Sequence, residues 1–316
     1  MTTNVRVAVV QAAPVILDRQ ATALKVCQLI EAAAAQGAQL VLFPEAFIPA
    51  YPRGLSFGAV VGSRTEEGRQ AYSRYWEEAV EVPGPVTELI GSAARQAAIY
   101  VAVGVVERES NQRGGTLYCT LLYFGPDGQL LPKHRKLKPT GSERLIWGEG
   151  DGSTLTTVGT DFGTVGGLIC WENYMPLART AMYSKGVDIY LAPTADARDS
   201  WQATIQHIAC EGRCFVLSCN QFVTRDDMPK DWEDIGTGPE VLCRGGSAIV
   251  GPLGQYLAGP MFDEEGILVA DLDMGLIPRA RYDFDVVGHY SRPDVFRLIV
   301  NEAPTASVVS ISQPAT

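Results

Sequence analysis

Short apolar runs alternate with amphipathic segments along most of this chain. The runs are rich in Val, Ile and Leu, a pattern typical of strands that are buried on both faces. We predict strands at 6–10, 40–43, 99–106, 116–124, 129–132, 187–192, 215–219, 247–250 and 267–272. Apolar residues at helical spacing predict helices at 66–80, 86–98, 176–185 and 200–213. Alternating strands and helices predict an α/β protein.

Cap and turn residues mark several element boundaries. Asp18 is placed to cap a helix that follows the first strand, and Gly37 is placed to end that helix. The Pro-rich sequence at 82–85 interrupts the next helical pattern. The segment 46–65 is rich in Gly and Pro, and 222–243 is polar, so we expect a long loop and an irregular region there.

One turn sequence occurs twice. Gly125–Leu131 (GPDGQLL) has an echo in Gly251–Leu257 (GPLGQYL), and each follows an apolar run. Gly-Pro turns are common in sheets, so the repeat has an ordinary explanation. The alternative is a two-fold pseudo-symmetry with two similar sheets facing each other. A sheet buried on both faces needs helices outside it, so that alternative predicts a four-layer αββα sandwich.

Composition narrows the class of protein. The chain has 316 residues and is 46% hydrophobic, which is enough for a sizeable core. Its net charge of −10 argues against a nucleic-acid partner, which would need a basic face. Every apolar run is too short to span a membrane, and Met1–Val7 has no signal-peptide core, so we expect neither membrane insertion nor export. Seven scattered cysteines are typical of reduced thiols in a cytoplasm.

Three chemically active side chains stand at the ends of apolar runs. Leu40–Phe47 (LVLFPEAF) carries Glu45, and Leu131–Pro139 carries Lys136 among basic neighbours. Val165–Asn173 (VGGLICWEN) is a strand-like run that reaches a cysteine and then turns. A carboxylate, an amine and a thiol at strand ends can form one cluster of acid, base and nucleophile.

The same three stretches resemble a known family. Phe43–Phe47 (FPEAF), His134–Thr140 (HRKLKPT) and Cys170–Asn173 (CWEN) are similar to the three signatures of the nitrilase superfamily, in that family's order, and specifically of its true nitrilase branch. The resemblance implies the four-layer αββα sandwich as one domain over 1–303. Residues 304–316 show nothing of it and are predicted to be a mobile tail.

The resemblance also implies roles for individual residues. Cys170 would be the nucleophile and Glu45 the general base. Lys136 would favour a thiolate and stabilise negative charge that develops on the attacked nitrogen. Glu143 matches a second acidic position near that lysine, where it would hold the lysine and help to transfer protons. The implied substrate is a small-molecule nitrile, and no cofactor is implied.

Most of the cysteines, lysines and histidines in these segments have a simpler structural explanation. A cysteine that ends an apolar strand is usually a buried hydrophobe, and we assign that role to the other six cysteines. Lys133 and Lys138 belong to an ordinary basic run. His207, Cys210 and Cys214 fall at helical spacing, but no second ligand pair accompanies them, so we predict no metal site.

The substrate pocket is indicated less directly. Trp147, Trp171 and Tyr174 adjoin the catalytic-type segments and are the candidate substrate-binding residues, although aromatic residues more often serve as packing. The segment Tyr51–Gly58 resembles plant-type nitrilases and their bacterial relatives. That resemblance implies an aromatic, arylaliphatic or cyanoalanine-like nitrile.

Two other functions remain open at this stage. An amidase of the same superfamily would share the trio, and a non-catalytic interaction protein could keep the fold. The family resemblance further implies a homodimer that builds larger homo-oligomers or spirals. An apolar stripe gives that assembly partial support from the sequence, although it could instead pack on its own sheet: Met175, Leu177, Met182 and Tyr183.

Overall fold

Two stacked β-sheets of seven strands each form the centre of the molecule. The computed structural model describes residues 4–109, 114–230 and 239–305. The first sheet contains β1 Asn4–Gln11, β2 Leu40–Leu42, β3 Val80–Val82, β4 Tyr100–Glu109, β5 Tyr118–Phe124, β6 His134–Arg135 and β14 Gly266–Asp273. The second contains β7 Thr157–Thr160, β8 Gly163–Gly167, β9 Ile189–Pro193, β10 Phe215–Cys219, β11 Phe222–Thr224, β12 Val241–Val250 and β13 Tyr256–Phe262.

The two sheets share a plan. In the first sheet, the parallel strands β1, β2 and β4 are flanked by the antiparallel strands β14 and β5. In the second, the parallel strands β8, β9 and β10 are flanked by the antiparallel strands β7 and β12. The repeated Gly-Pro turns follow β5 and β12, at equivalent places in the two sheets. The structure therefore favours the pseudo-symmetric interpretation of that repeat.

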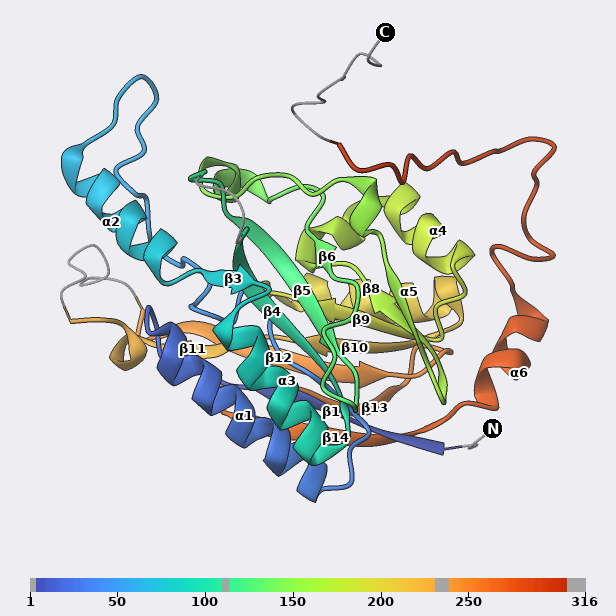
Figure 1. The fold of residues 1–316 in the computed structure, drawn as a ribbon. Coiled ribbons are helices and arrows are strands. Elements are labelled where there is room, and N and C mark those ends of the chain that lie inside the picture. The colour runs from blue at the N-terminus through green and yellow to red at the C-terminus, as the bar shows by residue number, and fades with distance from the viewer. Residues whose placement is uncertain (1–3, 110–113, 231–238, 306–316) are drawn as a thin grey trace, which may run out of the picture.

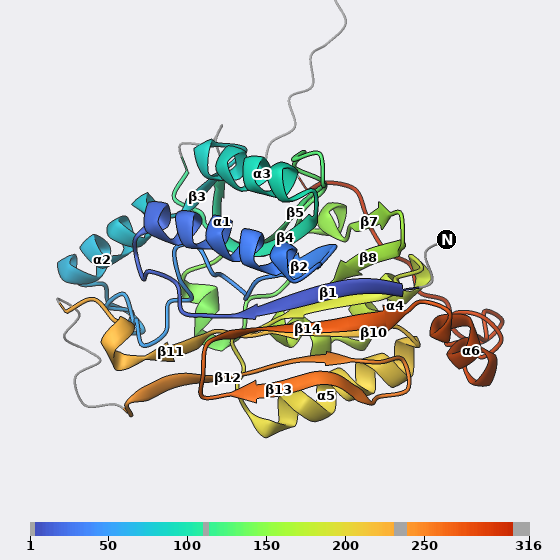
Figure 2. The same cartoon turned by 90° about the horizontal axis from the view of Figure 1, so that it is seen from below.

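Helices cover the outer face of each sheet. The described helices are α1 Arg19–Ala35, α2 Glu66–Glu77, α3 Pro85–Ala97, α4 Pro176–Ser184, α5 Asp199–Gly212 and α6 Leu276–Asp283. In Figure 2, the layers run from α1 and α3 through the two sheets to α5, and α4 and α5 lie together beside the second sheet in Figure 1. The predicted four-layer αββα sandwich is confirmed. No helix in the described ranges is long and apolar enough to cross a membrane.

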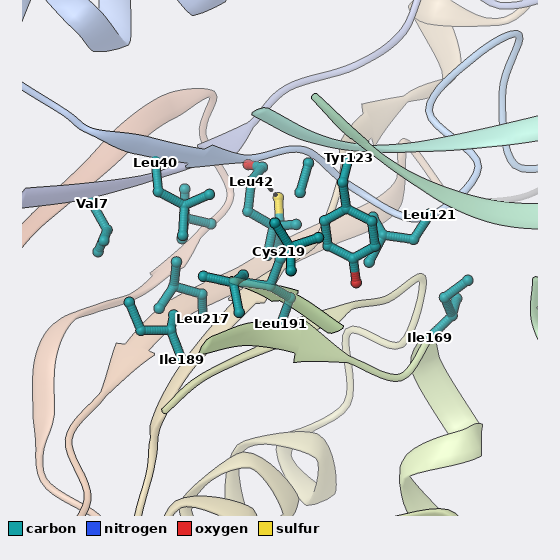
Figure 3. Close-up of a cluster of buried hydrophobic side chains, with 14 of the residues drawn as sticks. Val7, Leu40, Leu42, Leu121, Tyr123, Ile169, Ile189, Leu191, Leu217 and Cys219 are labelled. Atoms are coloured by element: carbon teal, nitrogen blue, oxygen red, sulfur yellow. Dashed lines mark hydrogen bonds between the residues drawn. The ribbon is translucent and has the colours of Figure 1, made fainter. Parts of the chain in front are cut away.

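The principal core lies between the sheets. Val7, Leu42 and Leu121 point inward from the first sheet and meet Leu191 and Leu217 from the second, as Figure 3 shows. Two further clusters join α1 and α3 to the first sheet, and α4 and α5 to the second. Burying apolar side chains on both faces of each sheet fixes the position of the strand ends, and those ends carry the candidate site.

Several local predictions need correction. The helix predicted over 66–80 stops at Glu77, because Val80–Val82 pairs with β4 as a short strand. The run 129–132 is no strand and makes only an isolated bridge from Leu130 to Phe124. The short elements β7, β11 and α6 were missed, and Val241 begins a longer strand than the predicted 247–250.

An extended segment follows α6. Residues 284–305 are largely exposed and run back toward the loop before β7, where Thr305 N donates to Asp151 Oδ2 at 2.6 Å. Glu302 pairs with Lys185 at 2.5 Å. The predicted mobile tail, 304–316, lies outside the described residues beyond Thr305.

Candidate functional site

A cavity of about 560 Å³ opens at one edge of the sandwich, above the ends of the parallel strands. Glu143 and Cys170 line it, together with Tyr51, Arg53 and Trp171. Parallel α/β sheets carry ligand sites at this edge because the carboxyl ends of several strands meet there. The loops after β2, β6, β8 and β9 therefore converge on one volume.

Glu45 lies three residues beyond the end of β2 and is fully buried. The backbone of this loop is fixed by two long-range hydrogen bonds: Phe47 N donates to Gly104 O at 2.8 Å, and Gln221 Nε2 donates to Glu45 O at 3.0 Å. Within the described residues, Glu45 Oε1 accepts from Lys136, whereas Oε2 is buried and accepts no hydrogen bond. One carboxylate oxygen is therefore unoccupied and able to accept a proton.

Lys136 connects two carboxylates. Its Nζ donates to Glu45 Oε1 at 2.6 Å and to Glu143 Oε2 at 2.7 Å. Glu143 is held in turn by Thr140 N at 2.6 Å on Oε2 and by the Tyr51 hydroxyl at 2.7 Å on Oε1. Among the three lysines of the basic run, Lys136 is the one that reaches this cluster, because Lys133 pairs with Glu107 and Lys138 pairs with Glu149.

Cys170 begins a short 3₁₀ turn, Cys170–Tyr174, three residues beyond the end of β8. Its φ of 52° is unusual for a residue with a side chain, and such strained positions collect at functional sites. The Thr194 hydroxyl lies 3.1 Å from Cys170 Sγ. Asn173 Nδ2 donates to Cys170 O at 2.8 Å, which secures the turn. The surrounding turn therefore holds the thiol in one orientation at the cavity wall.

A buried ion pair connects the turn at Cys170 to the segment that carries Lys136. Glu172 Oε2 accepts from Ile169 N at 2.8 Å, and Glu172 Oε1 accepts from Leu137 N at 2.6 Å. His134 Nε2 lies 3.0 Å from Glu172 Oε2, and both side chains are fully buried. One carboxylate thus contacts the residue before Cys170 and the residue after Lys136.

Burial dominates the electrostatics of the site. It raises the pKa of Glu45, against the charge of Lys136. Burial alone would lower the pKa of Lys136, but the negative charge of Glu45 opposes it most strongly, and the pKa is raised well above its usual value. Burial and the charge of Glu45 also raise the pKa of Cys170, and Lys136 opposes them only in part.

The resting thiol is therefore neutral. The family resemblance implies that Lys136 favours a thiolate, and Lys136 does lower the pKa of Cys170. Burial and the charge of Glu45 outweigh that effect, because a charged sulfur loses its hydration in this site. A reaction that used Cys170 as its nucleophile would then require a base to remove the thiol proton.

The three candidate substrate-binding residues occupy different places. Trp171 lines the cavity, and its indole N–H donates to Asp196 Oδ2 at 2.8 Å. Trp147 is buried behind Lys136, whose Nζ lies 5.8 Å from the centroid of its ring. Tyr174 stands outside the cavity lining and packs edge-on against Trp171 at 5.6 Å. The structure thus places only Trp171 of the three against the open volume.

Sequence analysis missed four residues that shape the site. The Tyr51 hydroxyl donates to Glu143, and the Thr194 hydroxyl contacts Cys170. Arg53 and Asp196 line the cavity. Thr194 follows the end of β9, so its position after an apolar run was a usable signal. Tyr51 and Arg53 lie in a loop without periodicity, so no pattern placed their side chains. In the described parts of the chain, no cluster of three or more His, Cys, Asp or Glu could hold a metal ion.

Comparison with known sequences gives the class of protein. The sequence profile of the carbon-nitrogen hydrolase family matches residues 6–282, and the chain belongs to that family. It is 58% identical to an aliphatic nitrilase of Sinorhizobium fredii, over 98% of this chain and 99% of the relative. It is 51% identical to the bifunctional nitrilase/nitrile hydratase NIT4A of Lupinus angustifolius, over 98% of this chain and 89% of the relative.

Solved structures have the same fold. Nit3 of Saccharomyces cerevisiae, a member of branch 10 of the nitrilase superfamily, superposes with a TM-score of 0.72. The comparison covers 92% of this chain and 97% of Nit3, at 21% sequence identity.

Proposed function

We propose that this chain is a nitrilase that converts R–CN and two waters to R–COOH and ammonia, with Cys170 as the nucleophile. The observation that carries the proposal is the buried cluster in which Lys136 joins Glu45 to Glu143 beside the Cys170 thiol. The nitrilase names of relatives that are 50–58% identical over nearly the whole chain support a nitrile as the substrate.

In the first step, Glu45 Oε2 takes the Cys170 proton as the sulfur attacks the nitrile carbon. A carbon–sulfur bond forms, and an electron pair of the triple bond moves onto nitrogen. The Lys136 ammonium stabilises this charge, and the nitrogen takes up a proton from the cluster. The product is a thioimidate on Cys170. A pKa of Glu45 above the ordinary carboxyl value suits a base that works near neutral pH.

Two waters complete the reaction. Glu45 removes a proton from the first water, which adds to the thioimidate carbon, and the nitrogen leaves as ammonia after protonation. A thioester remains on Cys170. The second water adds in the same way, the carbon–sulfur bond breaks, and the thiol regains its proton as the acid departs. Glu143 holds Lys136 in place and shares its protons throughout.

Ammonia release from a panel of nitriles tests the proposal. Aliphatic, aromatic and arylacetonitriles are each supplied beside the corresponding amide, with Cys170→Ala as the control. We expect acid and ammonia from at least one nitrile, and an acyl adduct on the Cys170 peptide by mass spectrometry. Turnover of amides alone would make the chain an amidase. Full activity of Cys170→Ala would remove Cys170 as the nucleophile.

Lys136 has a matched control in the same basic run. Lys136→Met removes the ammonium that faces the developing charge, and we expect hydrolysis to fall by about 10²–10³-fold. Lys138→Met removes an exposed lysine paired with Glu149, and we expect a change below about threefold. Circular dichroism shows whether each variant folds. Equal rates for the two variants would contradict the role of Lys136.

We further propose one domain over 1–303 and self-association through the surface beside Cys170. The exposed apolar residues Trp171, Tyr174, Met175 and Leu177 support an interface there.

A reducing compartment such as the cytoplasm is supported by seven unpaired cysteines. Aromatic, arylaliphatic or cyanoalanine-like nitriles remain the proposed substrates, and the rings of Tyr51 and Trp171 at the cavity wall, beside Arg53, support a substrate from this set.

A further inference from the structure

Three arginines line the cavity that contains Cys170, and two of them have carboxylate partners. Arg198 Nε donates to Asp196 Oδ1 at 2.8 Å. Arg244 pairs with Asp263 at 3.2 Å. Those two guanidinium charges are balanced within the protein.

Arg53 differs from both. Among the described residues it has no carboxylate partner, and its single hydrogen bond runs from Nη2 to Ala195 O at 3.0 Å. Its Nε is buried and bonded to nothing in that part of the chain. The guanidinium stacks over Tyr51 at 5.3 Å from the ring centroid. A half-buried cation without a counter-charge is costly, so its presence at the cavity needs an explanation.

The negative charge of the proposed catalytic cluster gives the Arg53 cation a role in binding an anionic substrate. Glu45 and Glu143 carry two negative charges against one positive charge on Lys136, so the cluster repels an anionic substrate. Arg53 lines the same cavity as Cys170. It binds the carbonyl of Ala195, the residue after Thr194, whose hydroxyl lies 3.1 Å from Cys170 Sγ. A guanidinium with free N–H groups binds a carboxylate tightly, often through two bonds.

We propose that Arg53 forms a carboxylate subsite, and that the substrate is a short aliphatic nitrile that itself carries a carboxylate. This inference rests on the proposed nitrilase activity. The carboxylate pairs with Arg53 at the cavity wall, and the cyano carbon reaches Cys170 Sγ. Arg198 and Arg244, whose charges are paired with carboxylates, then only form part of the cavity wall. Arg53 is the residue that favours a negatively charged substrate.

A purely structural role predicts something different. If Arg53 only secured Ala195 O and the Tyr51 ring, its loss would disturb Cys170 and lower the rate for every nitrile by a similar factor. The ratio between a charged and a neutral substrate of one shape therefore separates the two roles.

The test compares β-cyanopropanoate with isocapronitrile, in which an isopropyl group replaces the carboxylate. We expect the native chain to prefer β-cyanopropanoate in kcat/KM. In Arg53→Met, we expect the ratio of the two kcat/KM values to fall by about 10–100-fold, mostly through KM for the acid. Arg244→Met makes the same change of charge at the same cavity, and we expect its ratio to stay within about threefold. An unchanged ratio in Arg53→Met would overturn the proposal.

A binding measurement separates this proposal from the catalytic one. Calorimetry with Cys170→Ala measures the Kd of β-cyanopropanoate without turnover. We expect the Kd to rise by about 10–100-fold when Arg53→Met is added, and the Kd of isocapronitrile to change much less. If the native chain hydrolyses no nitrile, the proposed activity fails while this binding result still decides the subsite. Equal Kd values with and without Arg53 would refute the subsite even in an active nitrilase.

Discussion

At the scale of single residues, the charge of Glu45 disfavours ionisation of Cys170 before substrate binds. Each is buried, and the charge on Glu45 raises the pKa of the thiol beside it. The pair holds one proton on sulfur until substrate arrives. A neutral thiol is a weak nucleophile and resists oxidation, so this arrangement should protect Cys170 between turnovers of the proposed reaction.

Glu45→Gln separates the two effects of that carboxylate. Hydrolysis should fall by about 10²–10⁴-fold, because the base is lost. The pKa of Cys170 should fall as well, since a neutral amide replaces a negative charge. Alkylation by iodoacetamide across a pH series, followed on the Cys170 peptide by mass spectrometry, reports that pKa. A midpoint that stays in place or moves upward in Glu45→Gln would contradict this account.

At the scale of elements, the Glu172–His134 pair connects the two segments that carry the proposed catalytic residues Lys136 and Cys170. Burial alone would lower the pKa of His134, but the charge of Glu172 outweighs it, and the pKa of His134 is raised. His134 therefore stays protonated in the ion pair at pH values where a free histidine is neutral. The stability that this proton brings is fully present below about pH 6.5 and is lost as the pH rises through the raised value.

Glu172→Gln weakens the hydrogen bonds between the two segments and keeps a side chain of nearly the same size. The amide nitrogen cannot accept from either Ile169 N or Leu137 N, so one backbone donor loses its partner. We expect kcat to fall by about 10–100-fold with KM nearly unchanged, because the reacting groups lose register. Glu149→Gln, on an exposed side chain, is the control. A rise in KM with normal kcat would assign Glu172 to substrate binding instead.

Gly104 on β4 fixes the backbone that carries Glu45. A Cβ at Gly104 would lie 2.7 Å from Ala46 N and 2.8 Å from Glu45 Cα, so Gly104→Ala must push the loop away. We expect a loss of about 1–3 kcal/mol in the free energy of unfolding and a clear fall in kcat. Gly159→Ala, where a Cβ meets nothing within 4 Å, should leave both unchanged. Urea denaturation and ammonia release measure the two quantities.

The sequence predicted the elements that a hydrophobic period defines. The strands that carry Glu45 and Cys170, and the cap of α1 by Asp18 Oδ1 on Ala21 N, follow from local pattern and cap chemistry. The short strands β3 and β11 do not, since only pairing with β4 and β12 makes them strands.

The candidate site divides in the same way. Strand ends and signatures mark Glu45, Lys136 and Cys170 in the sequence, and their catalytic roles stay a prediction. Arg53 lies in the segment Tyr51–Gly58, which a family resemblance marks, but the loop has no hydrophobic period that would place the Arg53 side chain at the cavity. The protonation of Cys170 could not be predicted either, because it depends on burial that the fold creates.

At the scale of the whole molecule, the apolar stripe on α4 splits in two. Met182 and Tyr183 are buried against the second sheet, so for them the simpler packing explanation is correct. Met175 and Leu177 remain 38% and 67% exposed, beside the exposed ring of Tyr174. An apolar surface that adjoins the nucleophile turn favours an interface between copies of this chain.

Leu177→Asp tests that interface. A charge in the middle of an apolar contact should dissociate the assembly, and we expect a smaller mass by light scattering together with reduced activity on dilution. Leu24→Asp, on the exposed face of α1, is the matched control. A native chain that stays fully active as a monomer at every concentration would remove any role for association.

The pairing of β14 with β1 has a consequence for synthesis on the ribosome. Asn4 pairs with Asp273 and Gln11 with Gly266. Of the described strands, β1 is therefore the first to leave the ribosome, and its pairing is completed only by the last, β14. Until then, β1 presents an open apolar edge, which is the kind of edge that joins to other nascent chains. All residues of the proposed catalytic cluster leave the ribosome well before that edge closes. Yield in cells should therefore depend on chaperones that shield β1, and chains cut short before Gly266 should aggregate although they contain Glu45, Lys136 and Cys170.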